Sequence, residues 1–548
     1  MHYESKNDSS TTASRSKWNM AMDEWSKVLA PQSILIRDDI KSRYRQDTSH
    51  FNKTIAAVLL PTSRDEVQAL VRIAQKHAIA LYPISTGRNW GYGSALPCQD
   101  DCVLVDLSCL RTIIAIDHML GIVTVEPGVT QADLQRYLDE NRLDFMVPVT
   151  GAGPGCSLVG NALERGYGIT PYVDHCMSIM AIEAVLPSGE LYRSTMTSLL
   201  GNNAHSAFKW GIGPYFDGLF AQGNFGIVTQ MSIALVKRPH TIQAFYFWVD
   251  QDERLEATVT AIQEILTTCG SNVGGINLIS NVRMLAMSVP YPLEQVDETG
   301  LLPDSVVNAL ATENNISPWM GVGSIYGSKA HAHATRKTIR KLLKPHVKRI
   351  LFIDRSRIRL LEKILRIMPS KPAEKLGRLI HKMACGLELI EGRPNEVALP
   401  LAYWKSKTPP PETDLNPARD GCGLLWYAPI VPMQADAVRC YVNLTRKECK
   451  IHGIEPAITL TAISERAFDS TLPILFDCDD ECSAQRATEF YRTLFQKGKI
   501  HGFVPYRINS QFMDLVIDPQ EVCWQMGTKI KHAIDPNGIM APGRYSMV

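Results

Sequence analysis

Residues 85–97, with the sequence STGRNWGYGSALP, place three glycines beside an arginine and a tyrosine in one short stretch. Glycine lets the backbone approach an anion closely, and successive backbone N–H groups can form a concave anion site. Arg88 adds a permanent positive charge, and Tyr92 adds a phenol hydroxyl. The glycine spacing matches neither G-x-G-x-x-G nor the P-loop pattern. By itself the stretch therefore predicts either a phosphate site or a tight structural turn.

The elements around this stretch alternate between strands and helices. Residues 54–61 form a continuous apolar run that predicts a buried strand. Residues 63–78 begin with capping-box spacing and continue with apolar residues on one helical face. Strands are expected at residues 79–85 and 102–108. The glycine-rich stretch would then follow the end of a strand in a compact α/β unit.

The pattern changes twice further along the chain. A second glycine-rich segment, residues 148–168, leads into a short predicted helix. Residues 178–193 predict a hairpin, and residues 225–239 predict another strand. From about residue 241, aromatic strand-like runs alternate with long helical stretches, which indicates a second sheet.

Composition narrows the class of protein. A chain of 548 residues predicts two or three domains. The 57 basic and 56 acidic residues nearly cancel, so neither a nucleic acid nor an anionic membrane surface is expected as a partner. No apolar run approaches the ~20 residues that span a bilayer.

The N-terminus and the cysteines favour a cytoplasmic protein. Residues 1–18 are polar and lack the apolar segment of a secretory signal, and we expect them to form a disordered tail. The 13 cysteines are scattered and odd in number, which favours reduced thiols. No spacing typical of zinc ligands is present, so no metal is expected.

Four segments in a fixed order resemble the vanillyl-alcohol-oxidase and p-cresol-methylhydroxylase (PCMH) family of flavoproteins. Within that family they are most similar to the branch that acts on para-substituted phenols. The match is dense over residues 54–239. The four segments are PISTGRNWGYG, GPGCSLVGNALERGYGITPYVDH, GPYFDGLFAQGNFGIVTQ and, at the C-terminus, DPNGIMAPGR.

The resemblance implies an α+β fold with two domains. A PCMH-type FAD-binding domain with two subdomains would comprise residues 54–240 and would be completed by residues 496–548. An α+β cap domain with an antiparallel sheet, residues 241–495, would cover the substrate. Residues 1–53 would form a tail and lead-in.

The resemblance also implies the residues that bind FAD. The first glycine-rich loop would wrap the pyrophosphate, the second would follow the flavin and ribityl chain, and residues 226–228 would hold the adenine side. A basic residue near the C-terminus would approach the isoalloxazine. The implied residues are Ser85, Thr86, Gly87, Arg88, Asn89, Gly91, Gly155, Ser157, Gly160, Asn161, Gly226, Ile227, Val228 and Arg544.

On the substrate side, the resemblance implies that Tyr92, Tyr506 and Arg507 grip a phenol oxygen. Two hydroxyl donors and a guanidinium would favour the phenolate, which pushes charge toward the para carbon. A hydride could then leave the benzylic carbon for flavin N5 and generate a p-quinone methide. Asp174 matches the acidic residue of the family beside that carbon, where it would act as a base toward water or steer the intermediate. Each of these residues, taken singly, would as readily be structural.

Many relatives attach FAD covalently, and this chain departs from two of the known patterns. Arg88 occupies the histidine position of one branch, and Leu424 occupies that of another. Tyr403 lies close to the region where a cap tyrosine forms the link in a third group. A purely structural role for Tyr403 is equally consistent with the sequence, so covalent attachment stays open.

Three hypotheses about activity follow. The leading one is an FAD-dependent oxidase or dehydrogenase of a 4-alkylphenol, a small aromatic substrate, with O2 or a soluble carrier as electron acceptor and a homo-oligomeric assembly. The second keeps FAD but changes the substrate to a hydroxy acid, a sugar or a natural-product intermediate. The third is a non-catalytic flavin-binding scaffold.

Overall fold

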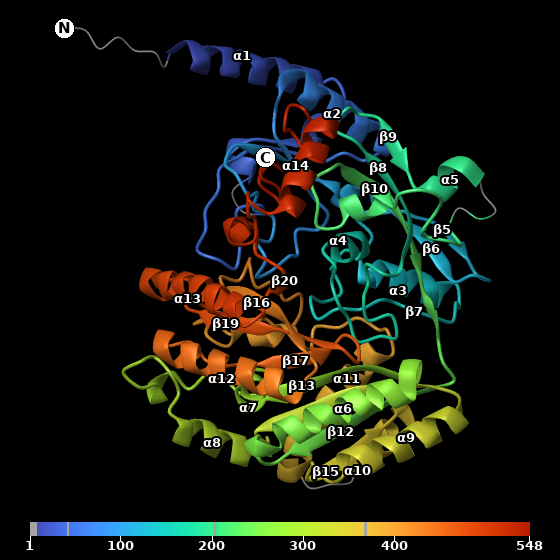
Figure 1. Cartoon of the computed structure of the whole chain (residues 1–548), viewed down its shortest axis with the longest axis vertical. Helices are drawn as coiled ribbons and strands as arrows, with labels where there is room; N and C mark the ends of the chain where they lie inside the picture. The colour runs from blue at the N-terminus through green and yellow to red at the C-terminus, as the bar shows by residue number, and fades with distance from the viewer. Residues whose placement is uncertain (1–7, 41–42, 201–203, 205, 367–369) are drawn as a thin grey trace.

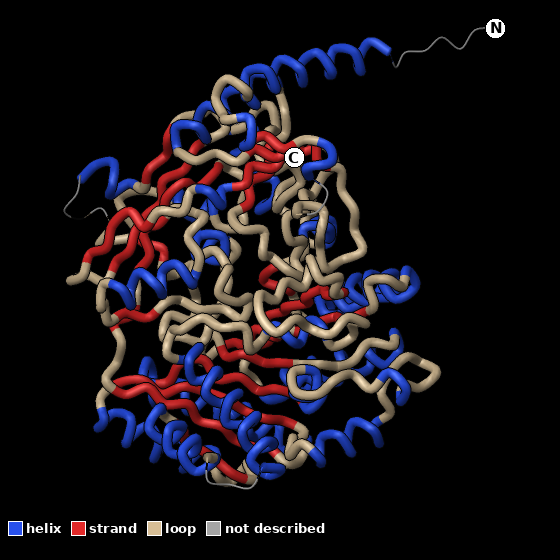
Figure 2. The backbone as a smooth tube through the Cα atoms, turned by 180° about the vertical axis from the view of Figure 1, so that it is seen from behind, coloured by secondary structure: helices blue, strands red, loops and turns tan. Residues whose placement is uncertain are grey.

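The computed structural model describes residues 8–40, 43–200, 204, 206–366 and 370–548. Two groups of strands lie above and below a middle layer that consists mainly of loops (Figures 1 and 2). The upper group contains the strands of the N-terminal half, and the last residues of the chain return to it (Figure 1). The lower group contains the strands from β12 onward (Figure 1).

The first sheet has four strands in the order β1-β2-β4-β3. β2 and β3 both run parallel to β4, because α2 provides the crossover between β2 and β3. Ser63 caps α2 by accepting a hydrogen bond from the backbone N–H of Glu66, as its spacing predicted. The elements are β1 (Ile34–Leu35), β2 (Ile55–Leu59), α2 (Arg64–His77), β3 (Leu81–Ile84) and β4 (Cys102–Asp106).

The expectation of a disordered N-terminal tail is wrong for the described part of that tail. α1 (Asp8–Trp25) is a helix of 18 residues that packs on α2. Ala21 and Trp25 are fully buried in a cluster with Leu70 and Val71. Burial of these apolar side chains against α2 stabilises the helix, although the polar residues before them gave no such signal. Residues 1–7 of the predicted tail lie outside the described residues.

The second sheet has five antiparallel strands in the order β5-β6-β10-β8-β9. The predicted hairpin is confirmed as β8 and β9. α3 and α4 bury apolar residues against this sheet, and a complete capping box of Thr130 and Asp133 begins α3. A short pair, β7 with β11, continues the chain toward the cap. The elements are β5 (Ile113–Asp117), β6 (Ile122–Val125), α3 (Gln131–Glu140), β7 (Phe145–Met146), α4 (Leu158–Leu163), β8 (Ile179–Val185), β9 (Leu191–Arg193), α5 (Thr195–Leu200), β10 (Ile227–Ala234) and β11 (Val236–Lys237).

The third sheet has nine strands, in the order β15-β12-β14-β13-β17-β18-β16-β19, with β20 paired to β16. All of its pairings are antiparallel, which confirms the sheet type expected for the cap. The strands are β12 (Thr241–Val249), β13 (Val273–Ser280), β14 (Trp319–Gly327), β15 (Arg349–Ile353), β16 (Gly423–Pro432), β17 (Thr459–Ala462), β18 (Ala467–Ser470), β19 (Leu472–Phe476) and β20 (Pro505–Arg507).

Helices α6, α9, α12 and α13 cover one face of this sheet and share its largest apolar core (Figure 1). α10 and α11 bury a smaller apolar cluster against β12 and β14. Within the described residues, no helix is both long and apolar enough to cross a bilayer. The helices are α6 (Leu255–Cys269), α7 (Asn281–Ala286), α8 (Asp304–Glu313), α9 (Lys329–Leu343), α10 (Arg355–Leu365), α11 (Ser370–Ile390), α12 (Ala435–His452), α13 (Glu481–Ile500) and α14 (Val522–Ile534).

The C-terminal segment connects the third sheet back to the first. The proposed domain boundary at residue 495 falls inside α13, and β20 still pairs with the third sheet. After α14, Met540 forms a parallel bridge with Leu81 of β3, and the N–H of Ala541 donates to Leu81 O. The last residues therefore lie beside the first glycine-rich loop.

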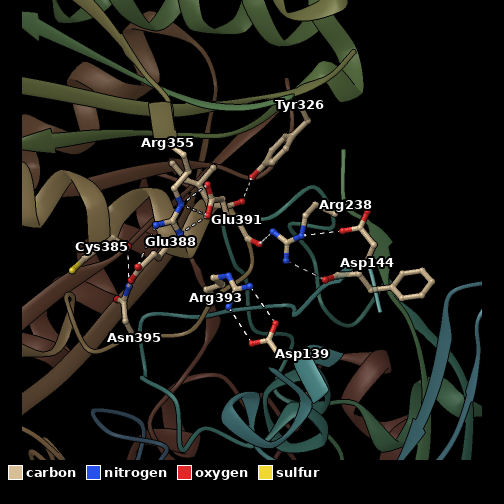
Figure 3. Close-up of polar contacts among 12 residues, drawn as sticks. Asp139, Asp144, Arg238, Tyr326, Arg355, Cys385, Glu388, Glu391, Arg393 and Asn395 are labelled. Atoms are coloured by element: carbon tan, nitrogen blue, oxygen red, sulfur yellow. Dashed lines mark hydrogen bonds and ion pairs between the residues drawn. The ribbon is translucent and has the colours of Figure 1, made fainter. Parts of the chain in front are cut away.

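A polar network joins the FAD-binding half to the cap (Figure 3). Arg393, which follows α11, donates to Asp139 at the end of α3 at 3.1 Å. Arg238, between β11 and β12, donates to the main-chain carbonyl of Glu391 at 2.8 Å. The Glu391 carboxylate accepts a second arginine, Arg355 of α10, at 2.8 Å. These contacts hold the segment after α11, whose residues 398–402 border the site, against the N-terminal half.

Candidate active site

A cavity of about 420 Å³ lies between the FAD-binding half and the cap. Its walls come from the end of β3 and the loop after it, from α4, from the segment before β10, from the cap and from the C-terminal tail. The loop follows the carboxyl end of β3 in a sheet with parallel strands, a position where ligands commonly bind. Of the residues expected from the sequence, the cavity is lined by Ser85, Thr86, Gly87, Arg88, Asn89, Tyr92, Ser157, Gly160, Asn161, Gly226, Val228, Arg507 and Arg544.

One end of the cavity has the features of a diphosphate site. Gly87 has a φ of +68°, which favours glycine and allows the loop to turn back over α4. A Cβ on Gly160 would lie 2.4 Å from Ser85 Oγ, so a larger residue would close the gap between loop and helix. A Cβ on Gly155 would lie 2.4 Å from the guanidinium carbon of Arg88. Bare backbone, hydroxyls and a cation thus converge where the pyrophosphate of FAD was expected.

Three expected cofactor residues do not line the cavity. Gly155 lies directly behind Arg88, and Ile227 is buried in β10, where it pairs with Val185. Gly91 has a φ of +75°, and a Cβ there would lie 2.2 Å from Cδ1 of Trp426. Gly91 therefore makes room for a cap side chain, and its neighbour Tyr92 reaches the cavity.

The cavity wall also brings together Tyr92 and Arg507, which come from segments far apart in the sequence. The guanidinium carbon of Arg507 lies 4.2 Å from the ring centroid of Tyr92. Arg507 also donates through Nη2 to Asn89 Oδ1, so the glycine-rich loop orients it. Burial raises the pKa of Tyr92, while Arg507 and a hydrogen bond with Tyr506 act to lower it. The Tyr92 hydroxyl is consequently a neutral hydrogen-bond donor at neutral pH.

Glu164 connects two of the arginines that line the cavity. Its carboxylate lies 3.3 Å from Arg507 Nε and accepts a hydrogen bond from Arg544, which also bonds Tyr82. Burial by itself would raise the pKa of Glu164, but Arg544 and Arg507 outweigh it and hold that pKa below its ordinary value. Two guanidinium groups therefore share one ionised carboxylate. The surplus positive charge favours an anion in this part of the cavity.

Tyr506 lies just outside the main cavity. It lines a smaller neighbouring cavity of about 330 Å³ together with Tyr545. Its ring meets that of Tyr167 edge to face, with the centroids 5.0 Å apart. Burial raises the pKa of Tyr506 well above its ordinary value, with Asp469 and Tyr92 contributing in the same direction. The structure thus brings Tyr506 close to Tyr92, although the two line different cavities.

Asp174 does not line the cavity. It is half-buried, its carboxylate accepts the backbone N–H of Met177 at 3.1 Å, and its backbone pairs with that of Tyr167. The neighbouring His175 is buried, and burial lowers its pKa to about 4. The catalytic role expected for Asp174 stays a prediction.

Asp469, which the sequence reasoning missed, is a buried acidic residue that interacts electrostatically with Tyr92, Tyr506 and Arg507, although it lines neither cavity. It projects from β18, is 3% exposed, and its Oδ1 has no hydrogen-bond partner among the described residues. Burial raises its pKa to about 7, although Arg507 acts to lower it. It also influences the pKa of Tyr92 and Tyr506, which places it near both. The signal in the sequence was a charged residue inside the otherwise strand-like run AFDS.

Tyr403 is buried outside the cavity lining. Its hydroxyl donates to Asp420 Oδ2 at 2.5 Å, and burial with this contact raises its pKa. Leu401 and Ala402, the residues before it, do line the cavity, as does Leu424. A covalent bond from Tyr403 to FAD would require its hydroxyl to leave Asp420, and the link stays a prediction.

The cap contributes a second residue that the sequence reasoning missed. Arg283 of α7 lines the cavity, and its guanidinium carbon lies 5.2 Å from the ring centroid of Trp426. Nothing in the local sequence distinguished this arginine from the many basic residues of the cap. Only the tertiary structure, in which Arg283 rests on the ring of Trp426 from β16, brings it to the site.

Comparison with known proteins agrees with this geometry. Residues 55–195 match the family model described as an FAD binding domain. The chain is 33% identical over 93% of its length to 1'-carboxy-chondrochloren decarboxylase of Chondromyces crocatus, of which it covers 94%. It is 27% identical over 96% of its length to the flavoprotein subunit of the hydroxylating 4-cresol dehydrogenase of Pseudomonas putida, of which it covers 95%. A substrate-bound crystal structure of p-cresol methylhydroxylase superimposes with a TM-score of 0.85 at 26% identity, with 97% of each chain covered.

The fold and the site define an FAD-dependent oxidoreductase. The chain belongs to the p-cresol-methylhydroxylase and vanillyl-alcohol-oxidase family, whose PCMH-type FAD-binding fold it shares. FAD is its cofactor, and its homologues act on small molecules. The bare backbone and hydroxyls of residues 85–89, together with Gly160, fit the diphosphate of that cofactor.

Proposed function

We propose that this protein removes a hydride from the benzylic carbon of a para-substituted phenol and forms a p-quinone methide. The observation that carries the proposal is the contact between Arg507 and Tyr92 in the cavity wall, with Tyr506 close to Tyr92 in the neighbouring cavity. A surplus of positive charge and neutral hydroxyl donors together favour a phenolate over a phenol. FAD, when bound, supplies the hydride acceptor at its N5 atom.

The protein residues would act on the phenol oxygen and on the proton. Arg507 supplies a fixed charge that Asn89 and Glu164 orient. Tyr92 donates a hydrogen bond to the same oxygen, and this bond strengthens as negative charge develops. Asp469, whose pKa of about 7 lies near neutrality, can accept the proton of the phenol or of a water that attacks the quinone methide. Asp174, which the sequence led us to expect as the base toward water, does not line the cavity, and its role stays a prediction.

A second outcome for the same intermediate is supported by the relative that is named a decarboxylase. A quinone methide is an electron sink, so a carboxylate on the carbon next to the benzylic carbon can leave as CO2. The C–C bond electrons then form the side-chain double bond, and the ring regains its aromatic phenolate. Both outcomes start from the same hydride removal and would use the same phenol-binding residues.

Similarity to known proteins supports a hydroxy-acid substrate less than it supports a phenol. D-2-hydroxyglutarate dehydrogenase of Stutzerimonas stutzeri matches 45% of this chain at 24% identity, which is far less coverage than the phenol-oxidising relative shows. The reduced cofactor would be reoxidised by O2 or by a soluble carrier, as we expected from the sequence.

Anaerobic mixing of the holoenzyme with 4-ethylphenol tests the proposal. The yellow absorbance of the flavin should bleach with the phenol and should persist with D-2-hydroxyglutarate. Bleaching by the hydroxy acid with none by any 4-alkylphenol would overturn the proposal in favour of the alternative substrate class. Analysis of the products then separates hydration from loss of CO2.

A further inference from the structure

Arg283 differs from the other arginines that line the cavity. Arg88 lies 3.7 Å from Asp414, and Arg507 and Arg544 share Glu164. Among the described residues, no carboxylate pairs with Arg283, and its buried Nη1 has no hydrogen-bond partner. Its one described side-chain interaction is with the face of the Trp426 ring.

This guanidinium is charged at neutral pH despite its burial. Burial lowers the pKa of Arg283 to about 9, which still leaves the side chain protonated. A charge removed from water needs a counter-charge or a full set of hydrogen bonds. Since the protein provides neither at Nη1, a ligand anion is the natural partner.

The position of Arg283 favours the substrate over the cofactor as the source of that anion. Trp426, on which the guanidinium rests, donates its backbone N–H to Gly91 O at 3.2 Å, directly before Tyr92. The diphosphate loop already has its own donors and its own cation, Arg88. The remaining cap residues in the cavity wall are mostly apolar, among them Leu399, Leu401, Ala402 and Leu424.

We propose that Arg283 binds a carboxylate at the end of the para side chain of the substrate, so that the preferred substrates are phenols with an acidic side chain. This inference rests on the proposed function and specifies its substrate class. Arg507 and Tyr92 would hold the phenolate at one end of the molecule, and Arg283 would hold the carboxylate at the other. A bidentate guanidinium–carboxylate pair fixes orientation as well as charge.

The proposal has a chemical consequence for a substrate such as 3-(4-hydroxyphenyl)propionate. Removal of hydride from its benzylic carbon leaves a quinone methide with a carboxylate on the adjacent carbon. Breaking the bond to that carboxylate releases CO2, and the bonding pair forms the double bond of 4-hydroxystyrene. The hydride would pass to bound FAD, and O2 or a soluble carrier would later remove the two electrons.

The test compares a matched pair of substrates in matched variants. Flavin reduction is followed anaerobically with 3-(4-hydroxyphenyl)propionate and with its neutral amide, in the parent, in Arg283→Met and in Arg283→Lys. The parent should prefer the acid, and Arg283→Met should lower the acid-to-amide ratio of reduction efficiency by about 100-fold. Arg283→Lys should restore part of that preference, because it keeps the charge but loses the planar fork.

A binding measurement that needs no turnover accompanies the kinetics. Calorimetry with 4-hydroxycinnamate and its amide, which carry no removable benzylic hydride, should show the same loss of preference in Arg283→Met. Equal affinity of the parent for acid and amide would overturn the proposal without any variant. An unchanged ratio with a large loss of FAD affinity in Arg283→Met would also overturn it and would assign Arg283 to the cofactor phosphates. Failure of the parent to be reduced by any phenol, neutral or acidic, would instead reject the proposed function itself.

Discussion

At the scale of single residues, the proposed phenol site depends on the charge of Arg507 more than on any hydroxyl. Arg507 contacts Tyr92, Asn89 and Glu164 at once. A guanidinium in this position can stabilise a phenolate and, through Asn89, is tied to the loop that holds the cofactor. Substrate chemistry and cofactor position are thus linked through a single side chain.

Replacement of Arg507 should therefore slow chemistry more than it weakens FAD binding. We expect Arg507→Ala to lower the rate of flavin reduction by 4-ethylphenol by about 10²–10³-fold, the usual cost of losing one group that stabilises developing charge. Stopped-flow absorbance gives the rate, and the ratio of flavin to protein absorbance gives FAD content. Arg492→Ala, which removes a partly exposed arginine paired with Asp514, is the control. Reduction at the parental rate would exclude a phenolate role for Arg507.

Asp469 should make the reaction depend on pH near neutrality. Its pKa is raised from 3.8 to about 7 by burial, so its carboxylate becomes available as a base only as the pH rises through about 7. We expect the rate of flavin reduction to rise over that range in the parent and to be flat there in Asp469→Asn. If both proteins showed the same rise, another group would be the base.

Asp469 should also make the free energy of unfolding depend on pH. This free energy should fall as the pH rises, whereas the reaction rate should rise. Between pH 3.8 and about 7, Asp469 keeps its proton in the folded protein but loses it in the unfolded chain. The folded state then binds more protons, so the free energy of unfolding falls as the pH rises through this window. In Asp469→Asn this contribution should disappear, and urea denaturation at several pH values would measure the difference.

At the scale of elements, the first glycine-rich loop packs against two others, α4 and β16. Its beginning turns over α4 at the cofactor end, and its later part, from Gly91, receives Trp426 of β16. A local sequence pattern indicated the first contact. The second contact depends on a strand that lies more than 300 residues away and could not be read from the loop itself.

Two alanine substitutions in this loop should separate backbone strain from steric overlap. Gly87 and Gly91 both have positive φ, so each alanine should cost about 1–2 kcal/mol for the left-handed backbone. At Gly87 the new Cβ would make an ordinary contact of 3.5 Å with Ala95, whereas at Gly91 it would overlap Trp426. Gly91→Ala should therefore lower the free energy of unfolding by about 1–3 kcal/mol more than Gly87→Ala does. Equal losses in denaturant titrations would contradict this packing.

At the scale of the whole molecule, the C-terminal tail packs against the N-terminal half of the chain. Lys531 of α14 is fully buried and donates to Asn224 O at 2.6 Å, to Met540 O at 2.9 Å and to Asp535 at 2.7 Å. These bonds hold the C-terminal tail, which carries Arg544, against the segment before β10. The two ends of the sequence thus build one cofactor site.

Replacement of Lys531 should weaken the attachment of the C-terminal tail to the N-terminal half. Lys531→Met would leave Asp535 buried without its counter-charge, which we expect to cost about 3–5 kcal/mol of unfolding free energy. Lys529→Met, at an exposed position two residues earlier, is the matched control and should change stability little. Thermal denaturation would measure the stability of each variant, and the ratio of flavin to protein absorbance would measure its FAD content. Equal stability and equal FAD content in the two variants would contradict this role of Lys531.

The order of strands and helices followed closely from the sequence. The apolar run of β2, the capped helix α2 and the hairpin of β8 and β9 each depend on residues within a short window, and the expectations for them are confirmed. α1 was missed because its stability comes from Trp25 packing on a helix about 45 residues away. The pairing of β20 with β16 likewise joins segments far apart in the sequence, and the domain boundary at residue 495 stays a prediction.

By itself the sequence determined the family and the cofactor, because motif order and glycine placement are local properties of the chain. Only the tertiary structure decided which charges are buried without a partner. Asp469 and Arg283 stand in unremarkable stretches, and their chemical importance comes from what distant segments exclude from water around them. The energy of a buried charge depends on all of its neighbours in space, and no local pattern records those neighbours.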